Sequence, residues 1–484
     1  MTLVLLLLIP FLAAVIVLTC KQSRRAVRVA MTAGAIEVAA IVHAVWRIHT
    51  VGVLQSGRYL RADGLTAFFL LSAGLILALV LMYSVGYLRH IPAGRFSSPR
   101  WFYSLTFLFV FTIMAVYLSA NLGMLWISVE STTLASALLV GFYNTKGAVE
   151  AGWKYLVVCT VGIAFALFGT IALYLAAVKS GVDPTSALDW DALMNAAPSL
   201  AATSNLVKLS FVFVAVGYGT KIGFVPMHSW LPDAHAEAPT PISAMLSAVL
   251  LNCALYALLR FDSITSQAIG SGFSHGLLLI FGCTSVAAAA LLMVVQRDLK
   301  RLLAYSSIEH VGIVALGIGI GGPLGIMGAL LHTFNHSVAK SLMFFTAGYV
   351  RDNYGTLRMR RIHGMARSLP WTSVGLTVGS IAIAGLPPFG LFISEFMILT
   401  AAFSASRYFI AILLMIALTV VFGALVHHLQ RMLAGKRVDL HDRPKLLPAD
   451  LTVMGICIAI LLVLGIHLPR AFANILQQAL VVLQ

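Results

Sequence analysis

Long apolar runs recur along almost all of this 484-residue chain, and each is long enough to cross a lipid bilayer. A hydrocarbon core of ~30 Å takes about 20 residues of α-helix. Because lipid offers no partners for backbone groups, only helices or closed barrels can span it, and these runs are too long for barrel strands. The chain is 60% hydrophobic and only 10% charged. The sequence therefore predicts an all-α polytopic membrane protein.

The runs predict about fourteen transmembrane helices. The first has no basic segment before it and no small-residue cleavage site, so we expect a retained helix and not a signal peptide. The expected limits of the spans are 2–20, 29–48, 64–88, 101–120, 121–143, 153–177, 206–230, 240–260, 274–296, 302–320, 324–350, 371–403, 404–430 and 449–468.

The net charge of +15 follows the membrane topology and does not indicate a nucleic-acid partner. Loops after odd-numbered spans, with the span ends beside them, hold 22 Lys and Arg residues. Loops after even-numbered spans and the C-terminal tail hold 8. Positive residues collect on the cytoplasmic side. We therefore expect a multi-pass protein of a prokaryotic cell (inner) membrane, in contact with the lipid bilayer, with both termini outside.

Two of the expected spans contain helix-breaking residues. The seventh holds Gly223 and Pro226, with Pro232 just beyond, and the twelfth holds Pro387 and Pro388 within GLPPFG. Glycine frees the backbone, and proline removes an N–H and clashes with the preceding turn. Non-helical backbone at membrane depth survives only inside protein or beside a cavity. We expect broken helices at both places.

The two breaks lie five spans apart, and an odd offset inverts the direction of corresponding helices. Interrupted segments in matching positions indicate an inverted-repeat transporter. We therefore predict two inverted five-helix repeats, with Lys221 and Glu395 in equivalent places beside the two breaks. The predicted units are 1–99 with helices 1–3, 100–262 with helices 4–8, 272–431 with helices 9–13, and 432–484 with helix 14 and a short tail.

Lone charges inside apolar runs give the first functional signal. Lys221, Lys340, Glu130 and Glu395 each lie within a predicted span. A charge at the centre of a membrane helix costs at least ~2.5–3.5 kcal/mol, so such residues are rare and usually functional. Two lysines and two glutamates indicate an ion or proton path. A static buried ion pair is the alternative.

Histidines extend this pattern. His332, His336 and Lys340 are spaced by four, which places them on one helix face. Histidine titrates near neutral pH and can pass a proton through either ring nitrogen. We interpret the three residues as a relay. Further candidates for the proton path are Glu309, His310, His228, His235, His427 and His428.

Motifs for redox cofactors are missing from the sequence. The five cysteines are scattered, with no spacing typical of zinc or an iron–sulfur cluster. There is no dinucleotide-binding fingerprint and no phosphate-binding loop. We expect no catalytic residue, no metal and no bound cofactor on this chain, so any redox chemistry would belong to another subunit.

Several segments resemble one family of membrane proteins. GTKIGFVPMHSWLPDAHAEAPTPISAMLSAVLLNCALYALLRF, QRDLKRLLAYSSIEHVG, LLHTFNHSVAKSLMFF and AGLPPFGLFISEFMIL are similar to the proton-translocating, antiporter-like subunits. These occur in respiratory complex I, Mrp-type cation/proton antiporters and group 4 membrane-bound [NiFe] hydrogenases. The resemblance covers spans 4 to 13. PMHSWLPDAHAEAP and YSSIEHVG are most similar to the F-type membrane protein of hydrogenase-4.

The resemblance implies roles for the buried charges. Glu130 and Lys221 would be the acid and base of a first half-channel, Lys340 the central relay and Glu395 the terminal relay. Complex I subunits of comparable size usually carry a lysine in span 8, where this chain has Asn252. The implied partners are other antiporter-like and quinone-subunit-like membrane subunits and a peripheral hydrogenase or redox arm. The NiFe centre and iron–sulfur clusters would lie in those partners.

The function that follows is proton, or Na⁺, transport driven by electron transfer in a group 4 hydrogenase or formate hydrogenlyase-type complex. Three alternatives stay open at this point: an antiporter-like subunit of complex I, a subunit of an Mrp-type antiporter, and a membrane scaffold that pumps nothing.

Overall fold

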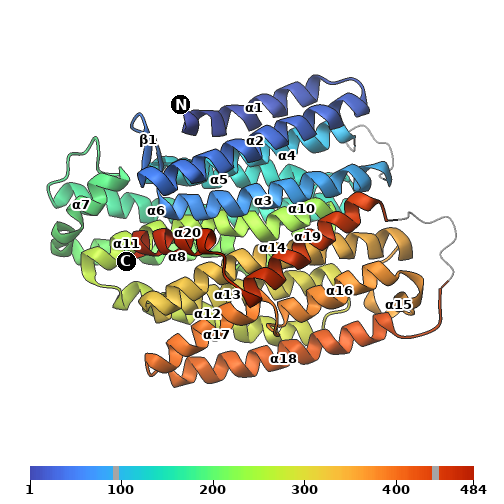
Figure 1. Cartoon of the computed structure of the whole chain (residues 1–484). Helices are drawn as coiled ribbons and strands as arrows, with labels where there is room; N and C mark the ends of the chain where they lie inside the picture. Colours follow the sequence, from blue (N-terminus) through green and yellow to red (C-terminus); the bar gives the residue numbers. More distant parts are fainter. Residues whose placement is uncertain (91–97, 439–445) are drawn as a thin grey trace.

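The computed structural model describes residues 1–90, 98–438 and 446–484, and most helices lie side by side in one bundle (Figure 1). The α-helices are α1 Thr2–Thr19, α2 Ser23–Val51, α3 Gly64–Tyr87, α4 Pro99–Leu118, α5 Leu122–Val140, α6 Lys146–Lys179, α7 Trp190–Leu200, α8 Ser204–Ile222, α9 Leu231–Glu237, α10 Thr240–Met245, α11 Leu251–Ile269, α12 Gly272–Val294, α13 Leu299–Ile320, α14 Gly322–Tyr354, α15 Met365–Ser368, α16 Pro370–Ile383, α17 Gly390–Ser404, α18 Tyr408–Leu433, α19 Pro448–Ile466 and α20 Arg470–Leu483. Short helical turns are η1 Leu88–His90, η2 Ala201–Thr203, η3 Met227–Trp230, the π-helical η4 Leu246–Leu250 and η5 Met359–Arg361, and two short strands, β1 Leu54–Ser56 and β2 Leu60–Ala62, pair antiparallel.

The prediction of an all-α polytopic membrane protein is confirmed. Within the described ranges, 12 helical segments are long and apolar enough to cross a membrane. The unbroken α14 and the interrupted pair α16 and α17 occupy the remaining two of the fourteen expected spans. α14 carries the buried histidines and Lys340.

Helix contacts follow the same order in the two groups that were predicted to be repeats. In the first group α4 packs on α5, α5 on α6, and α6 on α8 and α9. In the second α12 packs on α13, α13 on α14, and α14 on α16 and α17. The broken members of the two groups are α8–α9 and α16–α17, and the five-helix repeats with their bounds stay a prediction.

Both interruptions lie where the glycines and prolines stand. α8 ends at Ile222 because Gly223 has a φ of 93°, in the left-handed region that glycine favours. A Cβ there would lie 2.6 Å from Leu231 Cδ1, so a larger residue would have to displace that side chain as well as adopt a φ that disfavours it. The chain then passes through η3 before α9 begins, and Pro232 lies in the first turn of α9. In the second group Pro387 and Pro388 separate α16 from α17.

Three structured elements were not expected from the sequence: the β1–β2 hairpin, α7 and the C-terminal α20. α11 also runs beyond the predicted limit of 260, to Ile269. α7 buries one face through Trp190 and Leu193. α20 lies against α3, so the predicted short tail is largely helical and packed (Figure 1). At this contact a Cβ on Gly64 would lie 2.6 Å from the backbone of Gln478.

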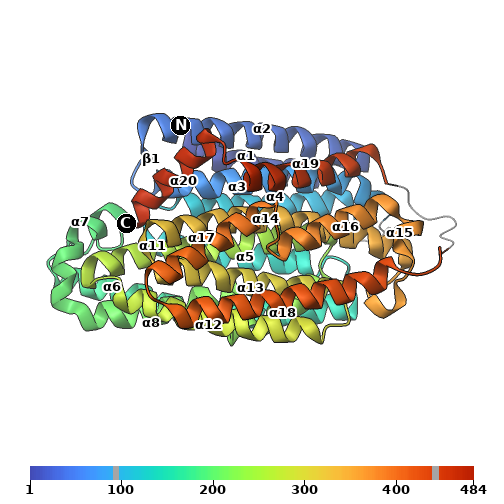
Figure 2. The same cartoon turned by 60° about the horizontal axis from the view of Figure 1, so that its bottom comes forward.

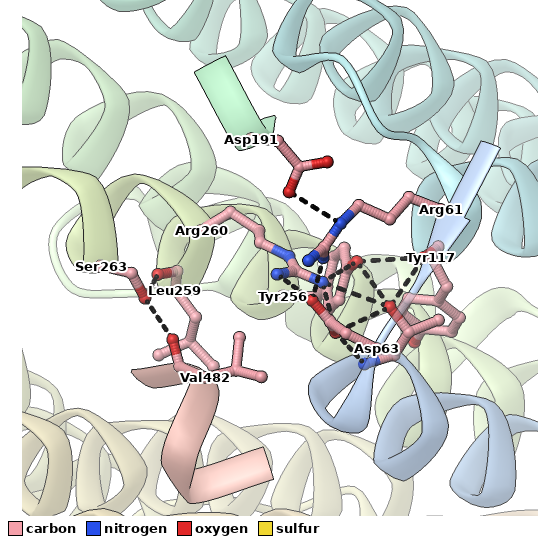
Figure 3. A network of polar contacts seen from close by, with 10 residues as sticks. Arg61, Asp63, Tyr117, Asp191, Tyr256, Leu259, Arg260, Ser263 and Val482 are labelled. Atoms are coloured by element: carbon pink, nitrogen blue, oxygen red, sulfur yellow. Dashed lines mark hydrogen bonds and ion pairs between the residues drawn. The ribbon is translucent and has the colours of Figure 1, made fainter. Parts of the chain in front are cut away.

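A buried ion-pair network ties these elements to the bundle (Figure 3). Arg260 on α11 binds both carboxylate oxygens of Asp63, each at 2.8 Å. Arg61 of β2 binds Asp63 as well, and it reaches Asp191 of α7 at 3.1 Å. Trp190 covers the guanidinium of Arg260, whose carbon lies 4.4 Å from a ring centroid of the indole. Asp63 also caps α3 by accepting from Thr66 N–H at 3.1 Å.

A labelling experiment tests the predicted orientation. Three of the basic residues counted for that prediction, Arg95, Arg443 and Lys445, lie outside the described residues. We expect cysteines introduced at Ser23 and Ala434, which are exposed, to react with a membrane-impermeant maleimide only from the cytoplasm. A cysteine at exposed Ser271 should react only from outside. Labelling of sealed vesicles of both orientations, with Cys20 and Cys283 replaced by serine, measures this. The reverse pattern would refute the orientation.

Candidate functional site

Lys221 lies in the last turn of α8, directly before the first break, and its side chain is fully buried. Its Nζ donates to the carbonyl oxygen of Val129 at 2.5 Å and to Thr133 Oγ1 at 2.6 Å, both on α5. The C-terminal end of a helix carries partial negative charge, which favours a cation there. The break therefore both ends α8 and holds an ammonium inside the bundle.

Glu130 is connected to Lys221 through a threonine. The Glu130 carboxylate accepts from Thr160 Oγ1 of α6 at 2.8 Å and from Thr133 Oγ1 at 3.2 Å. A hydroxyl has one proton to donate and two lone pairs to accept with, so Thr133 can accept from Lys221 while it donates to Glu130. The acid and base that the sequence indicated are thus hydrogen-bonded in a chain and not in direct contact.

Lys340 lies fully buried in the middle of α14, a helix of the second group that also packs on α10 and η4. Its Nζ donates to the carbonyl oxygen of Leu303 on α13 at 3.0 Å. An ammonium has three protons to donate. Among the described residues this is the one hydrogen bond that Lys340 Nζ makes, so its other protons are free to reach a moving partner or water.

Asn252 lies on α11, where the resemblance leads us to expect a lysine. Its amide nitrogen donates to the carbonyl oxygen of Ala248 at 2.7 Å and to Ser337 Oγ at 3.0 Å. Ser337 lies on α14 one turn before Lys340, so Asn252 links α11 to the helix that carries the central lysine. An amide does not titrate. Asn252 can therefore orient neighbouring groups but cannot carry a proton as a lysine can.

The histidines form a second hydrogen-bonded chain. His310 Nδ1 lies 2.9 Å from His332 Nε2, and His332 Nδ1 lies 2.9 Å from Ser394 Oγ on α17. The ring of His310 also lies close to that of His336, with centroids 5.2 Å apart. The sequence put His332 and His336 on one face of α14. The structure adds His310 of α13, which contacts both rings.

Two buried glutamates flank these histidines. Glu309 and Glu395 are each nearly inaccessible to solvent. Both oxygens of Glu309 and Oε1 of Glu395 have no hydrogen-bond partner among the described residues. Lys340 is near enough for its charge to act on Glu309, whose charge acts in turn on Glu395. These free oxygens can accept a proton or a water at the end of the histidine chain.

Glu395 lies against the second break, but not in the position that corresponds to Lys221. Lys221 precedes its break, on the first half-helix, whereas Glu395 lies on the half-helix that follows, α17. Its carboxylate occupies the space beside Gly385, whose φ is 65°, and a Cβ on that glycine would overlap it. Both breaks therefore adjoin an ionisable group, through different local arrangements.

One functional candidate escaped the sequence reasoning. Lys300 at the start of α13 is fully buried, and its Nζ donates to the carbonyl oxygen of Ala238 at 2.7 Å. His235 is buried near it with neither ring nitrogen bonded in the described chain, and the charges of both Lys300 and Lys340 act on that ring. The segment around Lys300 is charged and is predicted to be a loop. Nothing in the sequence therefore indicated that this lysine is buried.

The other expected path residues lie away from these chains or at their ends. Half-buried His228 lies in η3 beside Tyr305 of α13. Nearby Asp233 binds Lys154 and Arg301, which fixes α9 to α6 and α13. His427 and His428 lie together near the end of α18, and His428 Nε2 is 3.2 Å from the carbonyl oxygen of Met293. They contact α12 and not the histidine chain.

His310, His332 and Glu395 also bring three potential metal-binding atoms within 4.8 Å of one another. Imidazole and carboxylate groups are common zinc ligands. Both ring nitrogens of His332 already have hydrogen-bond partners in His310 and Ser394, so a metal would have to displace one of them. If these groups carry protons instead, His332 keeps both of its hydrogen bonds. That the chain holds no metal stays a prediction.

Comparisons with known proteins concern the family and the fold of the chain. Residues 119–422 match the family described as NADH:quinone oxidoreductase/Mrp antiporter, TM. The chain is 42% identical over 383 residues to the hydrogenase-4 component F homolog of Methylacidiphilum infernorum (isolate V4), covering 78% of this chain and 80% of that protein. It is 30% identical over 437 residues to NADH-quinone oxidoreductase subunit N of Desulforudis audaxviator (strain MP104C), covering 86% and 82%.

A solved structure has the same fold along the whole chain. It is a chain of the membrane-bound sulfane sulfur reductase, an archaeal respiratory membrane complex, with a TM-score of 0.88 over 99% of this chain and 97% of that one. The two sequences are 23% identical, so the likeness concerns the fold.

Proposed function

This chain belongs to the NADH:quinone oxidoreductase/Mrp antiporter family of transmembrane proteins, and we propose that it carries protons across the cell membrane as a subunit of a redox complex. The relative named for hydrogenase-4 favours a group 4 [NiFe] hydrogenase or formate hydrogenlyase-type complex. In that assembly a NiFe centre and iron–sulfur clusters belong to peripheral partners, and further antiporter-like and quinone-subunit-like chains lie beside this one in the membrane.

The observation that carries the proposal is the hydrogen-bonded chain from Thr160 through Glu130 and Thr133 to Lys221. Burial disfavours a charged lysine, and a nearby carboxylate favours it. A small movement of α5 against α8 would lengthen the bond from Lys221 to Thr133 and weaken the hold of Glu130 on the ammonium. Lys221 would then release its proton, which is the switch that a pump needs.

The second half supplies a continuation. We assign Lys340, which lies on the same helix as His332, to the link between Lys221 and the chain formed by His310, His332 and Ser394, with Glu395 as the next carrier. The lysine, histidine and glutamate side chains of that set can each gain or lose a proton. The serine hydroxyl can accept a hydrogen bond from one neighbour while it donates to another. His235 lies near both Lys300 and Lys340, and we assign Lys300 and His235 to the supply of protons to Lys340 from the predicted cytoplasmic face.

Thr133 provides a test, because its hydroxyl is the bridge between acid and base. We expect Thr133→Val, which keeps the branched shape, to slow redox-linked proton pumping by roughly 10²-fold, the low end of what a positioned proton carrier contributes. Thr133→Ser keeps the hydroxyl and should retain most of the rate. Pumping is measured in proteoliposomes of the complete complex, after blue-native electrophoresis has shown that the variant assembles.

A matched control is Lys179→Met on the exposed end of α6, which removes a lysine outside the chain and should leave pumping unchanged. Equal pumping by Thr133→Val and the parent would contradict the relay and favour a scaffold.

A role in complex I is the second candidate, because one relative is named as subunit N of an NADH-quinone oxidoreductase. Asn252 argues against it, because an amide in this place cannot take part as a lysine does. Co-purification of a [NiFe] large subunit would favour the hydrogenase assembly. An NADH-oxidising module would favour complex I, and cation-antiporter subunits alone would favour an Mrp-type assembly.

A further inference from the structure

A basic pocket lies where α12, α18 and η5 meet, away from the proton chains. It encloses about 250 Å³ and is lined by Val294, Val295, Gln296, Arg297, Met359, Arg360, His427, His428 and Arg431. α12 and α18 are neighbours along one edge of the bundle, and η5 packs on α18 (Figure 2). The pocket thus lies at the membrane-facing edge and at the ends of two spans.

The charges of this pocket have one sign. Arg297, Arg360 and Arg431 are exposed, and no carboxylate of the described chain lies within 4.0 Å of their guanidinium groups. The nearest polar contact of Arg431 is His427, with Nη1 3.4 Å from Nε2. The ends of α12 and α18 each contribute about −0.5 of a charge, which three full positive charges outweigh. The pocket therefore attracts anions.

An apolar surface leads into the same pocket. Along α12 the large side chains Ile280 and Leu291 are 60% and 68% exposed, and Val294 and Val295 continue to the pocket rim. Ile416 of α18, 58% exposed, faces outward on the neighbouring helix. In a membrane-spanning bundle these side chains face acyl chains. A charged pocket that ends an apolar stripe matches a molecule with an anionic head and a hydrocarbon tail.

We propose that this pocket binds the phosphodiester headgroup of an anionic phospholipid, whose acyl chains lie along α12 and α18. Arginine binds phosphate oxygens with paired, parallel hydrogen bonds, which suits three guanidinium groups around one phosphate. Basic pockets between membrane helices bind such headgroups in general. The proposal does not depend on the proton chains, and it gives His427 a role in lipid binding instead of the place in the proton path that the sequence suggested.

The test uses the complete complex, delipidated in detergent and titrated with phosphatidylglycerol or phosphatidylcholine while native mass spectrometry counts bound lipid. We expect tight binding of phosphatidylglycerol alone. Each positive charge near the headgroup contributes about 1 kcal/mol, so Arg297→Gln, Arg360→Gln and Arg431→Gln together should weaken binding by about 100-fold. Arg431→Gln alone should weaken it by about fivefold, which keeps the test usable if the triple variant does not assemble.

The matched control removes the same number of charges from an exposed segment on the same predicted side, with Arg24, Arg25 and Arg28 changed to glutamine. Its affinity for phosphatidylglycerol should equal that of the parent. An equal loss in both triple variants would overturn the proposal, because the attraction would then be general. Displacement of the lipid by millimolar inorganic phosphate, or equal binding of phosphatidylcholine, would overturn it as well.

Discussion

Replacing Lys340 with methionine is expected to abolish redox-linked proton pumping while the complex still assembles. Methionine keeps the length and the apolar packing of the side chain but cannot carry a proton. Since Lys340 is the proposed link between the Lys221 chain and the histidine chain, its loss would separate the two halves. We expect at least a 10²-fold fall in pumping rate, because a positioned acid or base contributes 10²–10⁴-fold.

Structural damage should be small in this variant. Lys340 Nζ has one hydrogen bond among the described residues, to a carbonyl of Leu303 that lies on α13. Assembly is checked by blue-native electrophoresis, and pumping is measured with a pH-sensitive dye in proteoliposomes while electron transfer is followed in parallel. Lys300→Met offers a comparison, since that lysine is equally buried but lies at the proposed supply end. Parental pumping by Lys340→Met would refute a relay through the centre of the subunit.

The largest stability effect is expected from Arg260→Met in the network of Figure 3. This change leaves the Asp63 carboxylate buried without the two hydrogen bonds, each 2.8 Å long, that Arg260 donates. Breaking a buried pair from one side typically costs 3–5 kcal/mol. The same guanidinium packs on Trp190 of α7, so the helix outside the bundle should loosen too. We expect a loss of about 3–5 kcal/mol in unfolding free energy.

Denaturation of the purified chain in mixed micelles measures this loss, and a double variant is the control. Asp63→Asn removes the charge but keeps the oxygen that caps α3 through Thr66. Asp63→Asn with Arg260→Met should therefore be less unstable than Arg260→Met alone, because the buried carboxylate that Arg61 alone would have to neutralise is gone, while Arg61 keeps its contact with Asp191. If the losses of unfolding free energy caused by the two substitutions simply add in the double variant, the two residues contribute separately.

The pH dependence of this pair follows from Asp63, which lies just before α3. Burial alone raises the pKa of its carboxyl, but the positive charge of Arg260, its hydrogen bonds and Arg61 bring that pKa well below its usual range. A group with a lowered pKa in the folded state stabilises the fold above its unfolded pKa. For aspartate that value is about 3.9. The contribution of the pair should stay constant from neutral pH to about pH 4 and disappear only below it.

Much of the architecture could be predicted from the chain because lipid imposes strict rules on what may span it. Run length fixed the spans, and glycine and proline placed the breaks at Gly223 and Pro387. The rarity of charge at membrane depth identified Lys221 and Lys340, both of which are buried. These conclusions rest on local composition, which needs no knowledge of the neighbouring helices.

Contacts between distant segments are what only the tertiary structure decided. Packing decides that Thr133 bridges Glu130 and Lys221 and that His310 lies between two histidines of another helix. Both contacts depend on how the helices are rotated and spaced. The burial of Lys300 depends on the carbonyl of Ala238, far away in sequence. Hydroxyl and carbonyl groups occur in every helix, so sequence marks where ionisable groups lie in the membrane, and packing decides which of them exchange a proton.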